Sequence, residues 1–248
     1  MYTMKVNYEE AGSPMKKTII FVHGAGGSSA TWFMQLRGLS TDFHIVAIDL
    51  NGHGKSPDRS ESDVLQSYQH DVNEVVTNFN RPVLAGHSMG GALTQLYALS
   101  HPDNISGIVL IGTGAKLRVA PAVFNLLDSD FEGYVEAVGS FMFHENTSDE
   151  MIDASKHEVR KCPVQIIRRD FELCDRFDIM ERVKEIRSPA LILVGEADIM
   201  TPVKYSQYLK DQIKDSTMHV VKDAGHSVML EQYGVFNDLL RNWVRDID

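Results

Sequence analysis

The chain has 248 residues, 43% of them hydrophobic and 23% charged, which is typical of a globular protein with one large domain or a core that carries an insertion. Its 24 basic and 34 acidic side chains give a formal net charge of −10, which disfavours nucleic acid and anionic membranes as partners because both bind concentrated basic charge. No apolar run approaches the roughly 18 residues that span a bilayer, the N-terminus lacks the layout of a signal peptide, and the two cysteines, Cys162 and Cys174, are too few for a disulfide framework. We therefore expect a cytoplasmic protein with reduced thiols and no membrane partner.

Short apolar runs alternate with longer amphipathic segments along much of the chain. After a polar hairpin predicted over residues 1–13, buried strands are predicted at 18–22, 44–50, 82–85, 105–111, 190–194 and 217–221. Helical patterns are found at 32–39, 62–79, 90–100, 203–212 and 233–244. This alternation predicts an α/β fold, with a mostly parallel, doubly wound sheet that is covered by helices on both faces.

The alternation stops between Gly114 and Ser188. One helix face is predicted there by the spacing of Phe131, Tyr134, Val135, Val138, Phe141 and Met142. We therefore predict a helical insertion over residues 115–185 and a core made of residues 1–114 and 186–248.

The segment Gly86-His-Ser88-Met-Gly90-Gly91 follows the predicted strand at 82–85 and precedes a helical pattern. A G-x-S-x-G sequence in this context is typical of a nucleophile elbow, in which the serine lies on a sharp and strained turn. Gly86 and Gly90 would let the strand and the helix approach closely, and the serine hydroxyl would project beside the helix N-terminus. The pattern therefore predicts Ser88 as a catalytic nucleophile.

A serine nucleophile needs a base that takes its proton, and the chain has ten histidines. His226 is the best candidate because it follows the last predicted strand, and open α/β sheets bind their ligands at the carboxyl ends of strands. An orienting carboxylate is expected after the strand at 190–194, where Asp198 and Glu196 compete. We favour Asp198, which completes the chain order serine, acid, histidine.

Acyl transfer through a serine also needs N–H donors that stabilise the oxyanion of the intermediate. Met89, directly after the nucleophile, is predicted to supply one donor. The glycine-rich loop at 23–29 is predicted to supply the other, with Ala25 favoured and Gly26 as the alternative. Gly24 and Gly26 would allow this loop to turn its backbone toward the nucleophile and the substrate.

Two segments come close to nucleotide-binding motifs without meeting their requirements. Residues 24–29 end in serine where the third glycine of G-x-G-x-x-G belongs, and Gly54-Lys-Ser56 has Asp49 where a phosphate-binding loop needs its first glycine. The sequence also contains no H-E-x-x-H segment and no paired C-x-x-C segments. It therefore predicts neither a metal site nor a cofactor.

The chain resembles the α/β-hydrolase superfamily, and five motifs in the family's order carry the resemblance: His23-Gly24, Asn51-Gly-His-Gly-Lys-Ser56, Gly86-His-Ser88-Met-Gly90-Gly91, Gly195-Glu-Ala-Asp198-Ile-Met-Thr-Pro202 and Gly225-His226. The resemblance implies the α/β-hydrolase fold and a cap, formed by the helical insertion, that roofs the active site. It points to small carboxylesterases and to the enol-lactonase and carbon–carbon hydrolase branches. Asn51 stands where many relatives have arginine.

Two positions narrow the branch that the resemblance implies. Ser88 sets aside the haloalkane dehalogenases and epoxide hydrolases, which use an aspartate nucleophile. His87 stands where carbon–carbon hydrolases usually carry asparagine, which favours ester, thioester or lactone cleavage.

These features predict a serine hydrolase that cleaves small-molecule carboxylic esters, with small to medium acyl or aromatic groups, through an acyl-enzyme. Lactone, thioester or carbon–carbon bond hydrolysis and a role as a slow-turnover small-molecule receptor remain open as alternatives. Phe141 and Met142 are expected to line the substrate pocket. The end of the insertion also carries a basic cluster, which is either a solvated face or a site for an anionic leaving group; it consists of Arg160, Lys161, Arg168 and Arg169.

Overall fold

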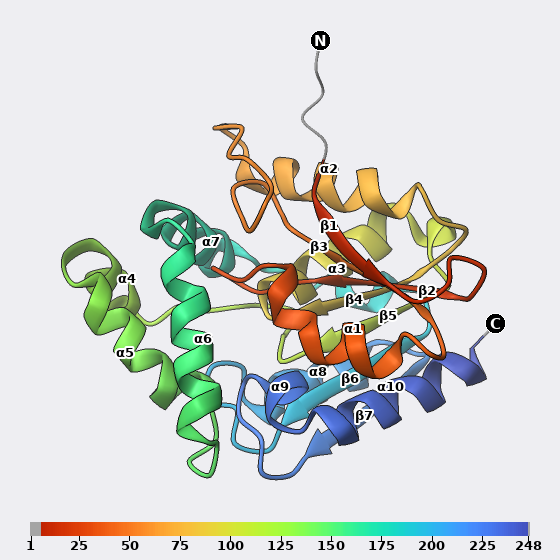
Figure 1. Ribbon diagram of the computed structural model, residues 1–248. Coiled ribbons are helices and arrows are strands. Elements are labelled where there is room, and N and C mark those ends of the chain that lie inside the picture. The colour runs from red at the N-terminus through yellow and green to blue at the C-terminus, as the bar shows by residue number, and fades with distance from the viewer. Residues whose placement is uncertain (1–5, 248) are drawn as a thin grey trace.

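A seven-stranded sheet forms the centre of the computed structural model, which describes residues 6–247 (Figure 1). The strands are β1 (Tyr8–Ala11), β2 (Thr18–Val22), β3 (His44–Ile48), β4 (Val83–His87), β5 (Gly107–Ile111), β6 (Ala190–Gly195) and β7 (Ser216–Val221). Their order is β1-β3-β2-β4-β5-β6-β7, and only β1 runs antiparallel to its neighbour. The predicted α/β class and mostly parallel sheet are therefore confirmed.

Two predictions about the edges of the sheet were wrong. The expected hairpin at 1–13 is, within the described residues, a single strand β1 that pairs with β3 rather than with the adjacent β2; residues 1–5 lie outside the description. The run at 217–221 was expected to be buried, but β7 is an edge strand, and Val220 is 44% exposed. An apolar run does not reveal whether a strand is covered on one side or both.

Helices cover both faces of the sheet because each strand presents alternate residues to opposite sides. The helices of this core are α1 (Phe33–Leu39), α2 (Val64–Val76), α3 (Met89–Ser100), α8 (Val203–Gln212), α9 (Val228–Glu231) and α10 (Tyr233–Asp246). Phe21 of β2 packs in one apolar cluster with α1, α9 and α10, whereas Ile20 packs in the other with α2, α3 and α8. The carboxyl ends of the parallel strands thus meet at one edge, where their loops can form a site.

Between β5 and β6 the chain forms four further helices, which gather at one end of the molecule (Figure 1). They are α4 (Pro121–Ser129), α5 (Phe131–Met142), α6 (Asp149–Lys161) and α7 (Val164–Arg176), and they share an apolar cluster of their own. The chain enters and leaves this bundle side by side, since Ile179 N–H donates to the Ala115 carbonyl at 2.8 Å. The ends of the predicted insertion pack in the main core instead, through Ala115, Val183 and the adjacent Ile186. The four helices therefore occupy a shorter stretch, residues 121–176, within the predicted 115–185.

None of the helices in residues 6–247 has the length and hydropathy needed to cross a membrane.

Candidate active site

Ser88 lies on a strained turn between β4 and α3. Its φ is +52° and its ψ is −114°, a backbone conformation that non-glycine residues rarely adopt. A Cβ atom at Gly86 would lie 2.1 Å from the Gly90 oxygen, and one at Gly90 would lie 2.2 Å from the Val22 oxygen. Both glycines are therefore required for the close contact of strand and helix, and Ser88 itself remains partly exposed.

A buried aspartate and histidine form a pair at the ends of β6 and β7. His226 Nδ1 lies 2.9 Å from Asp198 Oδ2, and the histidine is only 2% exposed. Thr201 completes this pair, because its N–H donates to Asp198 Oδ1 and its hydroxyl donates to Oδ2, both at 2.8 Å. The structure thus brings Asp198 to His226, whereas Glu196 is exposed and takes no part in the pair.

The charge state of Asp198 follows from these neighbours. Burial alone would raise the pKa of its carboxyl, but the charge and hydrogen bond of His226 and the donors of Thr201 outweigh burial and hold the pKa below its ordinary value. An ionised Asp198 can accept a hydrogen bond from His226 Nδ1–H, which leaves Nε2 as the ring atom that can exchange a proton with a substrate or nucleophile.

Gly112, the residue after β5, adjoins the pair, and its two neighbours in the chain bind the Ser88 backbone. A Cβ atom at Gly112 would lie 3.2 Å from His226 Nδ1 and 3.3 Å from Asp198 Oδ2, and its φ is +48°. Ser88 N–H donates to the Ile111 carbonyl and the Thr113 hydroxyl donates to the Ser88 carbonyl, both at 2.9 Å. The three residues predicted as nucleophile, acid and base therefore converge at the carboxyl edge of the sheet.

The glycine-rich loop after β2 lies directly against the serine. A Cβ atom at Gly24 would approach Ser88 Cβ to 3.3 Å, so only glycine fits without displacing its neighbours. Gly26 N–H donates to Asp170 Oδ2 at 2.9 Å and is thereby occupied. Within residues 6–247, neither Ala25 N–H nor Met89 N–H has a hydrogen-bond acceptor. These two amides are therefore unoccupied and the Gly26 amide is not; the role of Ala25 and Met89 as oxyanion donors remains a prediction.

His87, next to the nucleophile, is a polar residue that the sequence did not single out for a role. Its Nε2–H donates to the His226 carbonyl at 3.0 Å, and the two rings lie 4.6 Å apart between centroids. Burial, followed by the charge of His226, lowers the pKa of His87 to about 3. His87 is therefore neutral at pH 7 and holds the backbone of residues 222–227, the loop that carries His226 and is called the histidine loop below. Thr201 was missed as well; an aspartate that begins a turn indicates backbone donors just after it, but not a side-chain donor.

The helical insertion contacts the histidine loop through the end of α5. The Met142 carbonyl accepts a hydrogen bond from Ser227 N–H at 3.0 Å, which places this residue beside the loop that carries His226. Phe141 packs at the edge of the insertion's apolar cluster, with its ring 5.8 Å from that of Tyr134. Their assignment as substrate-binding residues remains a prediction.

The basic cluster of the insertion consists of paired side chains. Arg160 contacts Glu132 and Glu136 at 3.0 Å, Lys161 contacts Glu158 at 2.6 Å, Arg168 contacts Asp128 at 2.5 Å, and Arg169 contacts Asp58 at 2.8 Å. Each cation already has a carboxylate partner, which argues against a site for an anionic leaving group. Arg160, Lys161 and Arg168 are 38% to 57% exposed and fit the solvated face, whereas Arg169 is only 16% exposed and does not.

Asp49, which stands where a phosphate-binding loop would need its first glycine, is a structural residue. It is fully buried, and its carboxylate accepts hydrogen bonds from Ser29 N–H, Asn7 Nδ2 and Lys55 N–H at 2.7 to 3.0 Å. Within the described residues, no group of three or more histidine, cysteine, aspartate or glutamate side chains could hold a metal ion.

Comparison with known proteins places this site in a family. A family model described as serine aminopeptidase, S33, matches residues 13–233. The chain is 28% identical to a candidate carbamate hydrolase, RutD, of Variovorax paradoxus (strain S110), over 97% of this chain and 96% of that protein. A solved thermophilic esterase is 31% identical and superposes with a TM-score of 0.87 over 97% of this chain and 93% of that chain. The enol-lactonase from Burkholderia xenovorans LB400, 21% identical, superposes with a TM-score of 0.84 over 97% of this chain and 96% of that chain. Since the family model spans most of the chain and the sheet has the matching topology, the chain belongs to the serine aminopeptidase S33 family of α/β-hydrolases.

Proposed function

We propose that this protein is a serine hydrolase that cleaves carboxylic esters of small to medium acyl or aromatic substrates. The observation that carries the proposal is the buried Asp198–His226 pair beside Gly112, together with a strained and partly exposed Ser88 whose backbone is bound by the two neighbours of Gly112. A hydroxyl, a base and an orienting carboxylate in this arrangement support nucleophilic acyl transfer. The 31% identity with a thermophilic esterase supports an ester as the substrate.

The reaction would proceed in two steps through an acyl-enzyme. Ser88 attacks the ester carbonyl while His226 Nε2 takes the hydroxyl proton, and Asp198 stabilises the imidazolium that forms. The free amides of Ala25 and Met89 hold the oxyanion. His226 then protonates the leaving alcohol and afterwards takes a proton from the water that releases the acid.

The acyl pocket would lie between the core and the cap. The apolar cluster of the insertion contacts two partly buried residues of the core: Ala25 of the glycine-rich loop, and Met200 of residues 196–202, the acid loop that carries Asp198. Phe141 and Met142 pack against the same cluster. An apolar wall beside the nucleophile favours an uncharged acyl or aromatic group. The helical insertion would thus act as a cap over the site.

The test is turnover of p-nitrophenyl esters from acetyl to palmitoyl. Ser88→Ala should lower kcat about 10⁴- to 10⁶-fold, as removal of a serine nucleophile does elsewhere. Ser60→Ala is the matched control, because Ser60 also has a positive φ but lies exposed on a loop, and it should keep kcat within about twofold. Activity of Ser88→Ala within tenfold of the wild type would contradict the proposal.

The absence of wild-type turnover on every ester would also contradict it. Lactones, thioesters and vinylogous diketones would then be assayed, followed by a ligand-dependent shift in melting temperature. These assays address the lactonase, thioesterase, carbon–carbon hydrolase and receptor alternatives.

A further inference from the structure

Asp170, in the middle of α7, is a fully buried carboxylate that takes no part in the proposed chemistry. It accepts three hydrogen bonds from three different segments of the core. Gly26 N–H donates to Oδ2 at 2.9 Å, His53 Nε2 lies 2.7 Å from the same oxygen, and the Tyr68 hydroxyl donates to Oδ1 at 2.5 Å. Burying a carboxylate costs free energy unless hydrogen-bond donors compensate for the lost water, and here three donors do so.

The contact with Gly26 fixes the turn that carries the proposed oxyanion donor. Gly27 N–H donates to the Gly24 carbonyl at 3.1 Å, and Gly26 has a φ of +66°, as the third residue of a type II turn requires. The Gly26 N–H belongs to the central peptide of this turn. Because Asp170 holds that peptide, it also fixes the orientation of the adjacent Ala25 N–H.

The other contacts fix the carboxylate itself. Tyr68 holds Oδ1, and Arg169 Nε donates to the Tyr68 hydroxyl at 3.0 Å while its Nη1 pairs with Asp58. Burial alone would raise the pKa of Asp170, but the charge of His53 and the three donors outweigh it, so the pKa lies below its ordinary value and the group is ionised at neutral pH.

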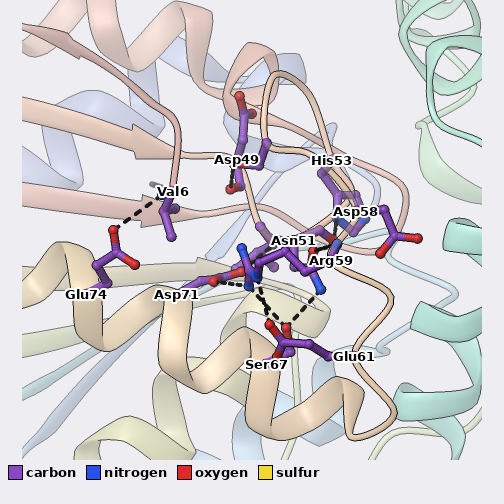
Figure 2. A network of polar contacts seen from close by, with 12 residues as sticks. Val6, Asp49, Asn51, His53, Asp58, Arg59, Glu61, Ser67, Asp71 and Glu74 are labelled. Carbon is purple, nitrogen blue, oxygen red and sulfur yellow. Dashed lines mark hydrogen bonds and ion pairs between the residues drawn. The ribbon is translucent and has the colours of Figure 1, made fainter. Parts of the chain in front are cut away.

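The loop at 51–59 supplies the remaining support. Figure 2 shows Asn51, Arg59, Ser67 and Asp71 converging there, with Asn51 N–H donating to Asp71 at 2.7 Å and Asn51 Nδ2 donating to Ser67 at 2.9 Å. His53 projects from this braced loop toward α7. The partners of Asp170 are therefore rigid, and the carboxylate has little freedom to reorient.

We propose that Asp170 is a positioning residue of the oxyanion hole, which holds the 24–27 turn with Ala25 N–H toward the substrate carbonyl when α7 is docked on the core. This inference rests on the proposed ester hydrolysis at Ser88. It makes docking of the cap helix a condition for fast acyl transfer, because a single side chain of the cap orients a core amide.

The test compares Asp170→Ala, which removes the acceptor of Gly26 N–H, with the wild type in two measurements. The first is steady-state hydrolysis of p-nitrophenyl butyrate, and the second is the rate of covalent modification of Ser88 by an alkyl fluorophosphonate, whose phosphoryl oxygen would occupy the same hole. Asp170→Ala should lower kcat about 10- to 100-fold, the range expected for a displaced oxyanion donor, with KM within about threefold. The rate of modification should fall by a similar factor.

Asp175→Ala is the matched control. Asp175 lies on the same helix, is half-buried and accepts a backbone N–H, that of Val119 at 3.2 Å, but it does not contact the glycine-rich loop. It should keep both rates within about twofold. A kcat of Asp170→Ala within threefold of the wild type, a loss confined to KM, or an equal loss in Asp175→Ala would overturn the inference.

Two further outcomes distinguish a failure to fold from a failure of the proposed role. If Asp170→Ala does not fold, Tyr68→Phe removes the donor to Oδ1 and frees the carboxylate to rotate. In that variant kcat should fall about three- to tenfold at constant KM, and a change in melting temperature alone would overturn the inference. If the wild type hydrolyses no ester, the proposed function fails, whereas the modification rates still test the role of Asp170.

Discussion

Replacing Asp198 with asparagine removes the charge that faces His226 and keeps the size of the side chain. In the wild type, Oδ2 accepts from His226 Nδ1 at 2.9 Å and from the Thr201 hydroxyl at 2.8 Å, while Oδ1 accepts from Met200 N–H at 2.9 Å and from Thr201 N–H at 2.8 Å. With two backbone donors on one oxygen, the asparagine carbonyl will take that position. Its amide NH₂ then faces His226.

That orientation reverses the hydrogen bond and changes the tautomer. An NH₂ group donates to Nδ1, so the ring carries its proton on Nε2, where it cannot take the proton of Ser88. In other serine triads this substitution lowers kcat about 10⁴-fold with the geometry intact. We expect a loss of about 10³- to 10⁴-fold here, which corresponds to about 4 to 5.5 kcal/mol of activation free energy.

The assay is p-nitrophenyl ester hydrolysis at pH 7 and above, with Glu196→Gln as the control. Glu196 is exposed and does not contact His226, so its loss of charge should change kcat less than about twofold. The reasoning is refuted if Asp198→Asn keeps kcat within tenfold of the wild type, or if Glu196→Gln loses as much.

Two further predictions concern stability. Because the pKa of His87 is lowered to about 3 in the folded protein, the unfolded chain binds a proton at higher pH, so the folded state loses stability as the pH falls below 6.5. Between pH 5.5 and 4, the free energy of unfolding measured in urea should fall about 1.4 kcal/mol per pH unit more steeply in the wild type than in His87→Gln. Equal slopes would contradict this prediction. Gly90→Ala should lower the free energy of unfolding by more than about 3 kcal/mol, since its Cβ would lie 2.2 Å from the Val22 oxygen, whereas Gly234→Ala, with open space in α10, should change it by about 1 kcal/mol or less.

Most of the sheet and the turn at Ser88 could be predicted because their determinants are local. The parallel strands are short apolar runs that can be recognised without knowledge of their partners, although the edge strand β7 could not be told from a buried one. The turn at Ser88 is encoded by two glycines at fixed spacing, which the structure explains by contacts near 2 Å. The choice between Asp198 and Glu196 required the acid loop itself, where Thr201 folds back onto the aspartate and leaves the glutamate in solvent.

The contribution of the insertion could not be predicted, because it depends on contacts between segments far apart in the chain. Asp170 reads as one more acidic residue in an amphipathic helix, and its partners Gly26 and His53 are 144 and 117 residues away. Helical periodicity identifies α5 as an element but does not show that the Met142 carbonyl would meet the histidine loop. A single sequence records the residues of such pairs without recording the pairing.

These contacts give the helical insertion two points of attachment to the loops of the proposed site. On one side Asp170 holds the glycine-rich loop. On the other, Glu231 accepts from Gly225 N–H at 2.9 Å with one oxygen and from His144 N–H at 2.7 Å with the other, so it joins the histidine loop to the segment after α5. Substitutions that reshape the acyl pocket without touching either attachment should therefore change KM and leave kcat intact, whereas those that loosen an attachment should lower kcat for every substrate alike.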